Sequence, residues 1–170
     1  SLWLHTADGV LLRLRFGAGS ATREALPADT VQVVGNDDFW CARQRGGEVT
    51  CQVRGASFAL LRDAASAMAA TASEVCVVLT GGVVSCRDPR QVQALRAKAR
   101  RAAPEEASED TDPLVEGLSG AQTLAADKTH LCALTQDGQV LCWGEGWRGQ
   151  LGDGSAESHK DARVAPLPGR

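Results

Sequence analysis

Tyrosine is absent from this 170-residue sequence, and aromatic residues make up only 4% of it. Long hydrophobic runs are absent as well. No apolar stretch approaches the ~18 residues of a membrane-spanning helix, so we expect no membrane span. The net charge is −3, which gives no indication of general nucleic-acid binding. Met68 is the one methionine, and the sequence starts at Ser1 without a visible signal peptide. We therefore expect a processed or trimmed product, or a fragment.

Familiar catalytic motifs are also missing. The sequence has no Gly-x-Ser-x-Gly, Walker loop, His-Glu-x-x-His or Cys-x-x-Cys pattern. Its histidines are scattered, and although His130 and Cys132 could be metal ligands, His130 is explained more simply as a structural residue of a hairpin. The acidic run 109–112 lacks the glycine and the spacing of a calcium loop. We therefore predict a non-enzymatic protein with no catalytic residue, no cofactor and no metal site.

What the sequence does contain is a repeated β-hairpin with a cysteine on each arm. In residues 129–144, Asp137-Gly138 signals the turn, because glycine readily takes the left-handed conformation that closes a short hairpin. A loop over 136–138 with glycine last fits a type I turn followed by a bulge. Two more hairpins share this plan. All three have cysteines ten residues apart and the turn glycine in the same place: Cys41, Gly47 and Cys51; Cys76, Gly82 and Cys86; Cys132, Gly138 and Cys142. This regularity indicates an internal repeat.

The two cysteines of each hairpin fall opposite each other when residues are counted outward from the turn. Cross-strand neighbours lie about 4.5–5.5 Å apart, within reach of disulfide geometry, so we predict a disulfide in each hairpin. Paired cysteines favour an oxidising compartment. The alternative is reduced, buried cysteine in a cytosolic protein. A fourth copy near the N-terminus keeps a turn at residues 7–9 but has Trp3 and Arg13 at the cysteine positions.

The repeat divides the chain into units at about 1–29, 30–64, 65–87 and 118–167. Each full unit has a lead strand, a turn, the hairpin, and then a linking strand or loop. We expect lead strands at 30–35, 65–70 and 121–126, a fourth strand at 57–61, a loop at 16–29, and the approach to another blade at 163–167. One four-stranded sheet per unit predicts an all-β protein, a β-propeller with about four blades.

An insertion at 88–117 interrupts the regular spacing of the units. Residues 90–101 favour a basic helix by propensity, and 104–113 is acidic and expected to be mobile. We interpret the insertion as a solvated segment between blades, so that deletion of 91–112 would leave the fold intact. The alternative is a partner-docking arm.

The residues after the last hairpin carry a family resemblance. The run from Cys142 to Gly154 is Cys-Trp-Gly-Glu-Gly-Trp-Arg-Gly-Gln-Leu-Gly-Asp-Gly. It resembles the repeat of the regulator-of-chromosome-condensation superfamily, most closely the cysteine-rich bacterial versions, and the likeness is clear for about 120–167. Gly146 stands where the family usually has asparagine. The matching positions are Trp143, Gly144, Gly149, Gln150, Leu151 and Gly152. Gly149 and Gly152 permit tight bends, and Leu151 is expected to plug the base of the blade.

The resemblance implies a propeller, usually of seven blades. This chain supplies about four, so we expect a partial propeller that another segment or another chain completes, because an open propeller would expose strand edges. The expected seam includes Leu2, Trp3, Leu4 and Leu167. The alternative is a small ring closed by the four units themselves.

The leading functional interpretation is a protein-binding or scaffolding module of a secreted, periplasmic or cell-surface bacterial protein. One alternative is an inhibitor or regulator of an extracytoplasmic enzyme that acts through 88–117, as some secreted bacterial relatives do. Nucleotide exchange on a small GTPase, the activity of the eukaryotic founder, is less favoured because it requires a cytosolic or nuclear protein. For Trp143 and Trp147 we expect packing in the core or between blades, with a sugar or peptide site as the alternative. Possible partner contacts are Trp3, Trp147, Arg96, Arg100 and Arg101.

The cysteine pairing generates a direct prediction. Peptide mapping under non-reducing conditions is expected to recover three linked peptide pairs, Cys41–Cys51, Cys76–Cys86 and Cys132–Cys142. Because each link closes a short loop, each should contribute at most about 2–3 kcal/mol to stability. Free thiols, or links between units, would contradict the assignment.

Overall fold

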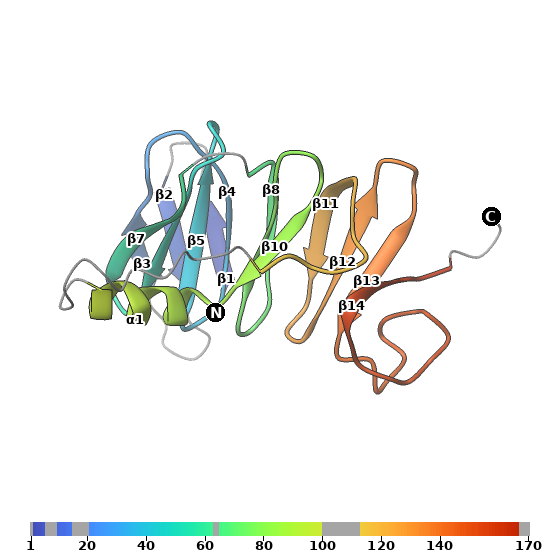
Figure 1. Cartoon of the computed structure of the whole chain (residues 1–170). Coiled ribbons are helices and arrows are strands. Elements are labelled where there is room, and N and C mark those ends of the chain that lie inside the picture. The colour runs from blue at the N-terminus through green and yellow to red at the C-terminus, as the bar shows by residue number, and fades with distance from the viewer. Residues whose placement is uncertain (1, 6–9, 15–20, 63–64, 100–112, 167–170) are drawn as a thin grey trace.

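A computed structural model describes residues 2–5, 10–14, 21–62, 65–99 and 113–166. These residues form four antiparallel sheets that follow one another in chain order (Figure 1). The strands are β1 (Leu2–His5), β2 (Val10–Leu14), β3 (Ala21–Ala25), β4 (Thr30–Gly35), β5 (Phe39–Gln44), β6 (Val49–Val53), β7 (Ala56–Leu61), β8 (Ala67–Ala70), β9 (Val75–Val78), β10 (Val84–Arg87), β11 (Ala121–Ala126), β12 (His130–Thr135), β13 (Val140–Gly144) and β14 (His159–Val164). The single helix among the described residues, α1, spans Pro89–Ala99.

Each sheet is one blade, and the blades are numbered here in chain order. Blade 1 is β1-β2-β3, blade 2 is β4-β5-β6-β7, blade 3 is β10-β9-β8, and blade 4 is β11-β12-β13-β14. The predicted fold class is therefore confirmed as an all-β arrangement of about four propeller blades with one helix. The predicted lead strands and the fourth strand of blade 2 are present as β4, β8, β11 and β7.

The hairpins have the register that the turn glycines predict. Cys41 pairs with Cys51, Cys76 with Cys86, and Cys132 with Cys142. Each pair is bonded as a disulfide. The glycines that close these turns have φ values of 93°, 76° and 79° at Gly47, Gly82 and Gly138, the left-handed region in which a side chain is disfavoured. In blade 1, Trp3 pairs with Arg13, as expected for residues that stand at the cysteine positions.

In blades 2 and 3, the cysteine-bearing face is the face that the next blade covers. Cys41 and Cys51 of blade 2 are fully buried in a cluster that includes Met68 of blade 3. Cys76 of blade 3 is fully buried in a second cluster with Leu131 of blade 4. Successive residues of β9 alternate between these clusters, since side chains of a strand point to opposite faces: Val75 and Val77 belong to the first, Cys76 and Val78 to the second.

Hydrogen bonds between blades repeat along the chain. The amide of Ala65 donates to the turn carbonyl of Gly47 at 3.1 Å, and the amide of Ala121 donates to that of Gly82 at 2.9 Å. Side-chain bonds add to this tie between blades 2 and 3, where Gln32 donates to the Met68 carbonyl at 2.7 Å and accepts from its amide at 3.1 Å. Neighbouring blades therefore have a fixed relative position.

Two sequence predictions about the chain's outer strands are corrected. Residues 16–29 were predicted to be loop, yet 21–25 form β3 on the edge of blade 1. Its side chains are mostly exposed, so it lacks the apolar alternation that marks a strand in sequence. Arg163 and Val164 belong to β14, the fourth strand of blade 4, rather than to the approach to a further blade.

The insertion also differs from its prediction as a solvated segment between blades. The helix begins at Pro89, a residue suited to the first helical position, and the Asp88 carboxylate accepts the Arg90 amide at 2.9 Å as an N-cap. Val92 is 7% exposed and belongs to the core of blade 2, and Gln93 donates to the Val53 carbonyl at 3.2 Å. After the insertion, Leu114 bridges Ser85 on the edge of β10. The insertion thus leaves blade 3 after β10, and its helix packs against blade 2. The chain then returns to the edge of β10 at Leu114. The residues predicted to be mobile, 104–113, lie outside the described residues except for Pro113.

Replacement of Val92 by alanine tests the packing of this helix. We expect a loss of about 1–3 kcal/mol, because a buried methyl-rich side chain is removed from the core. Leu95→Ala is the matched control, since Leu95 lies on the same helix and is 60% exposed. Chemical denaturation of both variants measures the difference, and equal stabilities would show that the helix does not contribute to the core.

Candidate functional site

The long loop 145–158, which joins β13 to β14 at the base of blade 4, has its own internal framework. Leu151 is 1% exposed and anchors it, as the sequence predicted for this position. Tight turns flank the anchor, with the Gly149 amide donating to the Gly146 carbonyl at 2.7 Å and the Gly152 amide donating to Gly149 at 3.1 Å. Gly149 and Gly152 have φ values of 74° and 67°, so the repeat motif needs glycine at both.

The second half of the loop is held by a carboxylate. Asp153 accepts from the Ser155 amide and hydroxyl, both at 2.9 Å, and these bonds hold the pKa of Asp153 below its ordinary value. Its second oxygen lies 3.2 Å from His159 Nε2, and both side chains are largely buried. Sequence reasoning missed this pair, because the two residues are brought together only by the folded loop.

Trp147 projects from this ordered loop. Its side chain is 55% exposed, whereas Trp143 is 5% exposed and lies in the core. The indole N–H donates to the Glu145 carboxylate at 3.1 Å, and the Arg148 guanidinium lies 4.1 Å from the ring centroid, a cation–π distance. The sequence predicted packing in the core or between blades for both tryptophans. Trp143 lies in the core, whereas Trp147 is not buried by the described residues of this chain. The residue carries the mixed aromatic and charged chemistry of a binding surface.

The other predicted contact residues do not join Trp147. Arg96 lies on α1, where its guanidinium is 5.8 Å from the Phe58 ring beside a hollow of about 200 Å³. Trp3 is placed only through its pairing in β1. Arg100 and Arg101 lie outside the described residues. The predicted contacts therefore mark separate surfaces rather than one site.

Sequence reasoning gave Arg90 no role beyond its place in the predicted helix, yet it links several elements. Its guanidinium contacts Asp88 at 2.9 Å, Asp38 of blade 2 at 3.6 Å, and the Ser73 carbonyl of blade 3 at 3.3 Å. The carboxylates of Asp88 and Asp38 raise its pKa. This arginine joins the helix start to turns of two blades, a structural role.

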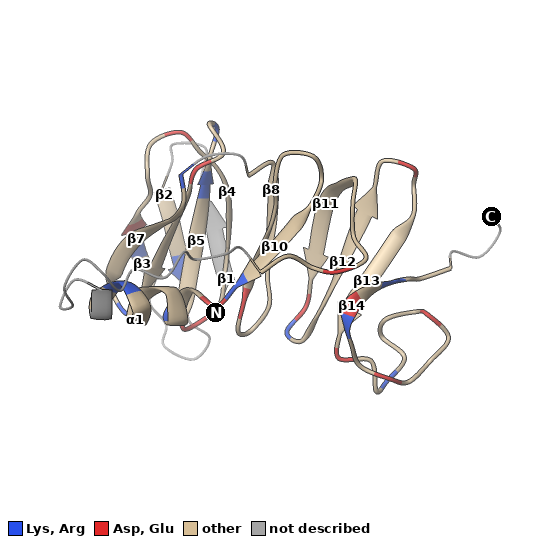
Figure 2. Ribbon diagram, in the orientation of Figure 1, with Lys and Arg blue, Asp and Glu red and all other residues tan. Residues whose placement is uncertain are grey.

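The charged and metal-ligating side chains of the described residues are dispersed. Lysine, arginine, aspartate and glutamate are spread over loops and strand ends rather than gathered in one field (Figure 2). The one cluster of three potential metal ligands among the described residues is Glu74, Cys76 and Cys86. Two of its ligand atoms are sulfurs of one disulfide, whereas metal binding requires thiolates. The described residues also include no helix with the length and apolar character needed to cross a membrane.

Gly146 provides a test of how the loop is held. A Cβ atom at this position would lie 1.8 Å from the Glu157 carbonyl oxygen, so Gly146→Ala should displace the backbone and cost about 2 kcal/mol or more. Gly154→Ala is the matched control in the same loop. It has no atom within 4 Å of the added carbon and should cost only about 1 kcal/mol of left-handed strain. Thermal unfolding that ranks the two variants in the opposite order would contradict this packing.

Comparisons with known proteins agree with the geometry. The model of the regulator of chromosome condensation (RCC1) repeat matches residues 128–150. The structure is similar to that of human WBSCR16, with a TM-score of 0.68 and 17% identity over 98% of this chain and 51% of that one. It is also similar to yeast RCC1 (Prp20) in a complex with Kap60, with a TM-score of 0.66 and 11% identity over 95% of this chain and 45% of that one.

A further structure of Prp20p from Saccharomyces cerevisiae gives a TM-score of 0.63 and 11% identity, over 98% of this chain and 48% of that one. The chain spans about half the length of these solved structures. At these identities the likeness concerns the fold. The chain therefore has the fold of RCC1-like β-propeller structures, with four successive sheets and one matched RCC1 repeat at 128–150.

Proposed function

We propose that this chain is a non-enzymatic protein-binding module that acts outside the cytoplasm. The observation that carries the proposal is the exposed Trp147 on a loop with a fixed conformation. Tryptophan and arginine are the residues most enriched among those that dominate binding energy at protein interfaces. Trp147 and Arg148 supply both types side by side, 4.1 Å apart.

The loop is prepared for binding before a partner arrives. The Glu145 carboxylate and the Arg148 guanidinium both hold the indole of Trp147, and the buried Leu151 anchors the loop beneath it. Ordering a side chain costs free energy on association, so a pre-ordered one loses less. The indole thus offers apolar area together with a charged rim.

A protein is the class of partner that this chemistry fits. A large apolar ring flanked by a guanidinium and a carboxylate matches an apolar hollow with charged groups at its edge. Known structures support the same class: the crystallised yeast RCC1 (Prp20) is bound to Kap60, and the work on Prp20p concerns its binding to Gsp1p and histones. Those partners are proteins, although their identities do not transfer to this chain.

The disulfides support the extracytoplasmic part of the proposal. The three bonds use all six cysteines, and such bonds persist mainly in oxidising compartments. Peptide mapping of protein alkylated inside its native cells tests this location. Alkylated cysteines would place the chain in a reducing compartment.

Inhibition of an extracytoplasmic enzyme through the insertion receives less support. The helix of the insertion buries Val92 in the chain's own core and sets Arg96 against Phe58. A helix engaged in this way offers less surface to a target than the loop of Trp147. We therefore assign binding to the Trp147 loop rather than to α1.

Substitution of Trp147 tests the proposal. Affinity capture from the native extracytoplasmic fraction, followed by titration of the captured protein, is expected to show binding about 30-fold weaker for Trp147→Ala than for the parent chain. Lys160→Ala is the matched control, because Lys160 is an exposed residue of the neighbouring β14. A captured partner whose affinity is the same for both variants would show that the Trp147 loop is not the binding surface.

A further inference from the structure

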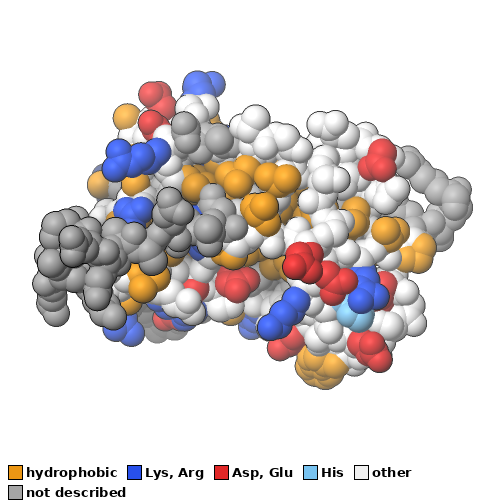
Figure 3. All heavy atoms as spheres, in the orientation of Figure 1, with side chains coloured by type: hydrophobic (Ala, Val, Ile, Leu, Met, Phe, Trp, Pro, Cys, Tyr) orange, Lys and Arg blue, Asp and Glu red, His pale blue; other side chains and the backbone are white. Residues whose placement is uncertain are grey.

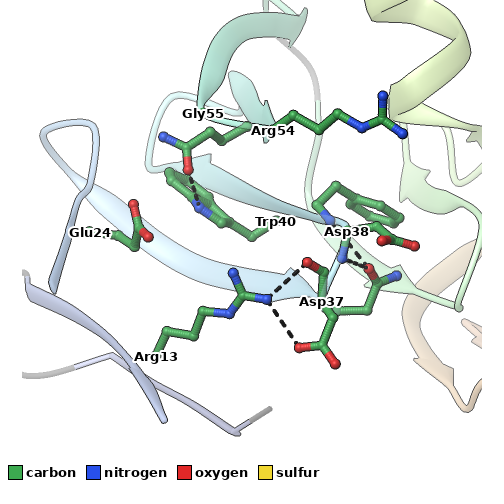
Figure 4. A pocket seen from close by; sticks show the side chains of 10 residues that line it. Arg13, Glu24, Asp37, Asp38, Trp40, Arg54 and Gly55 are labelled. Atoms are coloured by element: carbon green, nitrogen blue, oxygen red, sulfur yellow. Dashed lines mark hydrogen bonds and ion pairs between the residues drawn. The ribbon is translucent and has the colours of Figure 1, made fainter. Parts of the chain in front are cut away.

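A second, polar groove lies at the seam between blades 1 and 2 (Figure 4). It encloses about 360 Å³, a size typical of ligand sites. Blade 1 contributes Arg13 and Glu24. Blade 2 contributes the β4–β5 turn, the indole of Trp40, Gln52, and the Arg54-Gly55 turn between β6 and β7.

Most charges in this groove are already paired. Arg13 donates to the backbone carbonyl of Asp37 at 2.9 Å and to its carboxylate at 3.1 Å, and Asp38 lies 3.6 Å from Arg90. Glu24 and Arg54 are different, because neither has a hydrogen-bond or ion-pair partner among the described residues. In Figure 4 they flank Trp40, and the Arg54 side chain extends away from Glu24. The groove therefore offers the Glu24 carboxylate and the Arg54 guanidinium, which form no ion pair with each other.

The lining of the groove also supplies a hydrogen-bond donor. Trp40 is buried, and its indole N–H donates to Gln52 Oε1 at 2.8 Å. That bond fixes which end of the amide is oxygen, because an N–H can donate only to an acceptor. The Gln52 amino group then remains as a donor with no partner among the described residues. This amino group is suited to donate to a backbone carbonyl oxygen of a bound peptide.

Arg54 occupies an unfavourable backbone conformation. Its φ is 49°, followed by Gly55 at 82°, the pattern of a two-residue hairpin turn that prefers asparagine followed by glycine. An arginine at this position costs roughly 1 kcal/mol or more of local strain. Such strain at the mouth of a groove is typical of a residue retained for function rather than for stability.

We propose that this groove binds an extended protein segment that carries one basic and one acidic side chain. The basic side chain pairs with Glu24, the acidic one with Arg54, and the backbone between them accepts from the Gln52 amide. This site rests on the proposed protein-binding function but is separate from the Trp147 loop, and it gives the module a second contact of defined charge pattern.

Titration of capped peptides followed by two-dimensional NMR of the indole N–H signals tests the site. The probes contain one lysine and one aspartate separated by one or two alanines, in either order. We expect a saturable shift of the Trp40 signal. Arg54→Asn should bind about tenfold more weakly, since a charge-assisted contact is lost, while its melting temperature is unchanged or higher because asparagine suits the turn. Glu24→Gln should weaken binding by a similar factor.

Three controls separate this result from other causes. Arg45→Gln removes an arginine from an exposed turn of the same blade outside the groove and should bind as the parent chain does. Trp147→Ala should also bind the peptides normally, so that failure of this site and failure of the Trp147 surface are distinguishable. The proposal is overturned if the Trp40 signal does not move, if both groove variants retain parent affinity, or if peptides with only lysine or only aspartate bind equally well.

Discussion

The structure depends on the burial of the cysteine-bearing faces of blades 2 and 3 against the blade that follows each of them. The disulfide sulfurs of blade 2 lie beneath Met68 and Val77 of blade 3, and Cys76 of blade 3 lies beneath Leu131 of blade 4. In these clusters the half-cystines pack among aliphatic side chains, since cysteine behaves as a small apolar residue. The same bonds fix hairpin register, because a one-residue slip would move them to the other face.

A fixed stack of blades determines where function can lie. The buried strand side chains are used for packing between blades. Of the candidate contacts, Trp147 and Arg54 lie in a loop and a turn, as is usual for binding residues, whereas Glu24 and Gln52 lie on strands β3 and β6 that line the groove. Figure 3 agrees with this division, since apolar side chains cross the middle of the face shown and charged ones lie mostly above and below it. The Trp147 loop lies beneath blade 4, whereas the groove with Glu24 and Arg54 lies at the seam of blades 1 and 2.

Turn glycines and cysteine spacing were sufficient to predict the repeat, the hairpin register and the propeller fold, because these features depend on local geometry. Strand β3 was missed because its exposed side chains carry no apolar pattern. The predicted helix was expected to be solvated, and its docking was missed because the described side chains of the helix that are buried and apolar are only Pro89 and Val92. Two such residues give too weak a signal in a basic segment. Trp147 was expected to pack in the core or between blades because tryptophan is highly buried on average, and only the folded loop reveals its exposure. The Glu24–Arg54 groove joins residues of different blades, which no local pattern brings together.

The most direct test of the account concerns the outer face of blade 4, where Leu134 is 40% exposed beside Cys132 on the face opposite blade 3. If cysteine-bearing faces pack against a following blade, this face binds another blade or another chain. Light scattering with apolar-dye binding on the isolated chain should then show association or dye uptake, and Leu134→Lys should suppress both. A parent chain that stays monomeric at high concentration and binds no dye would contradict the account and favour a ring closed by these four units.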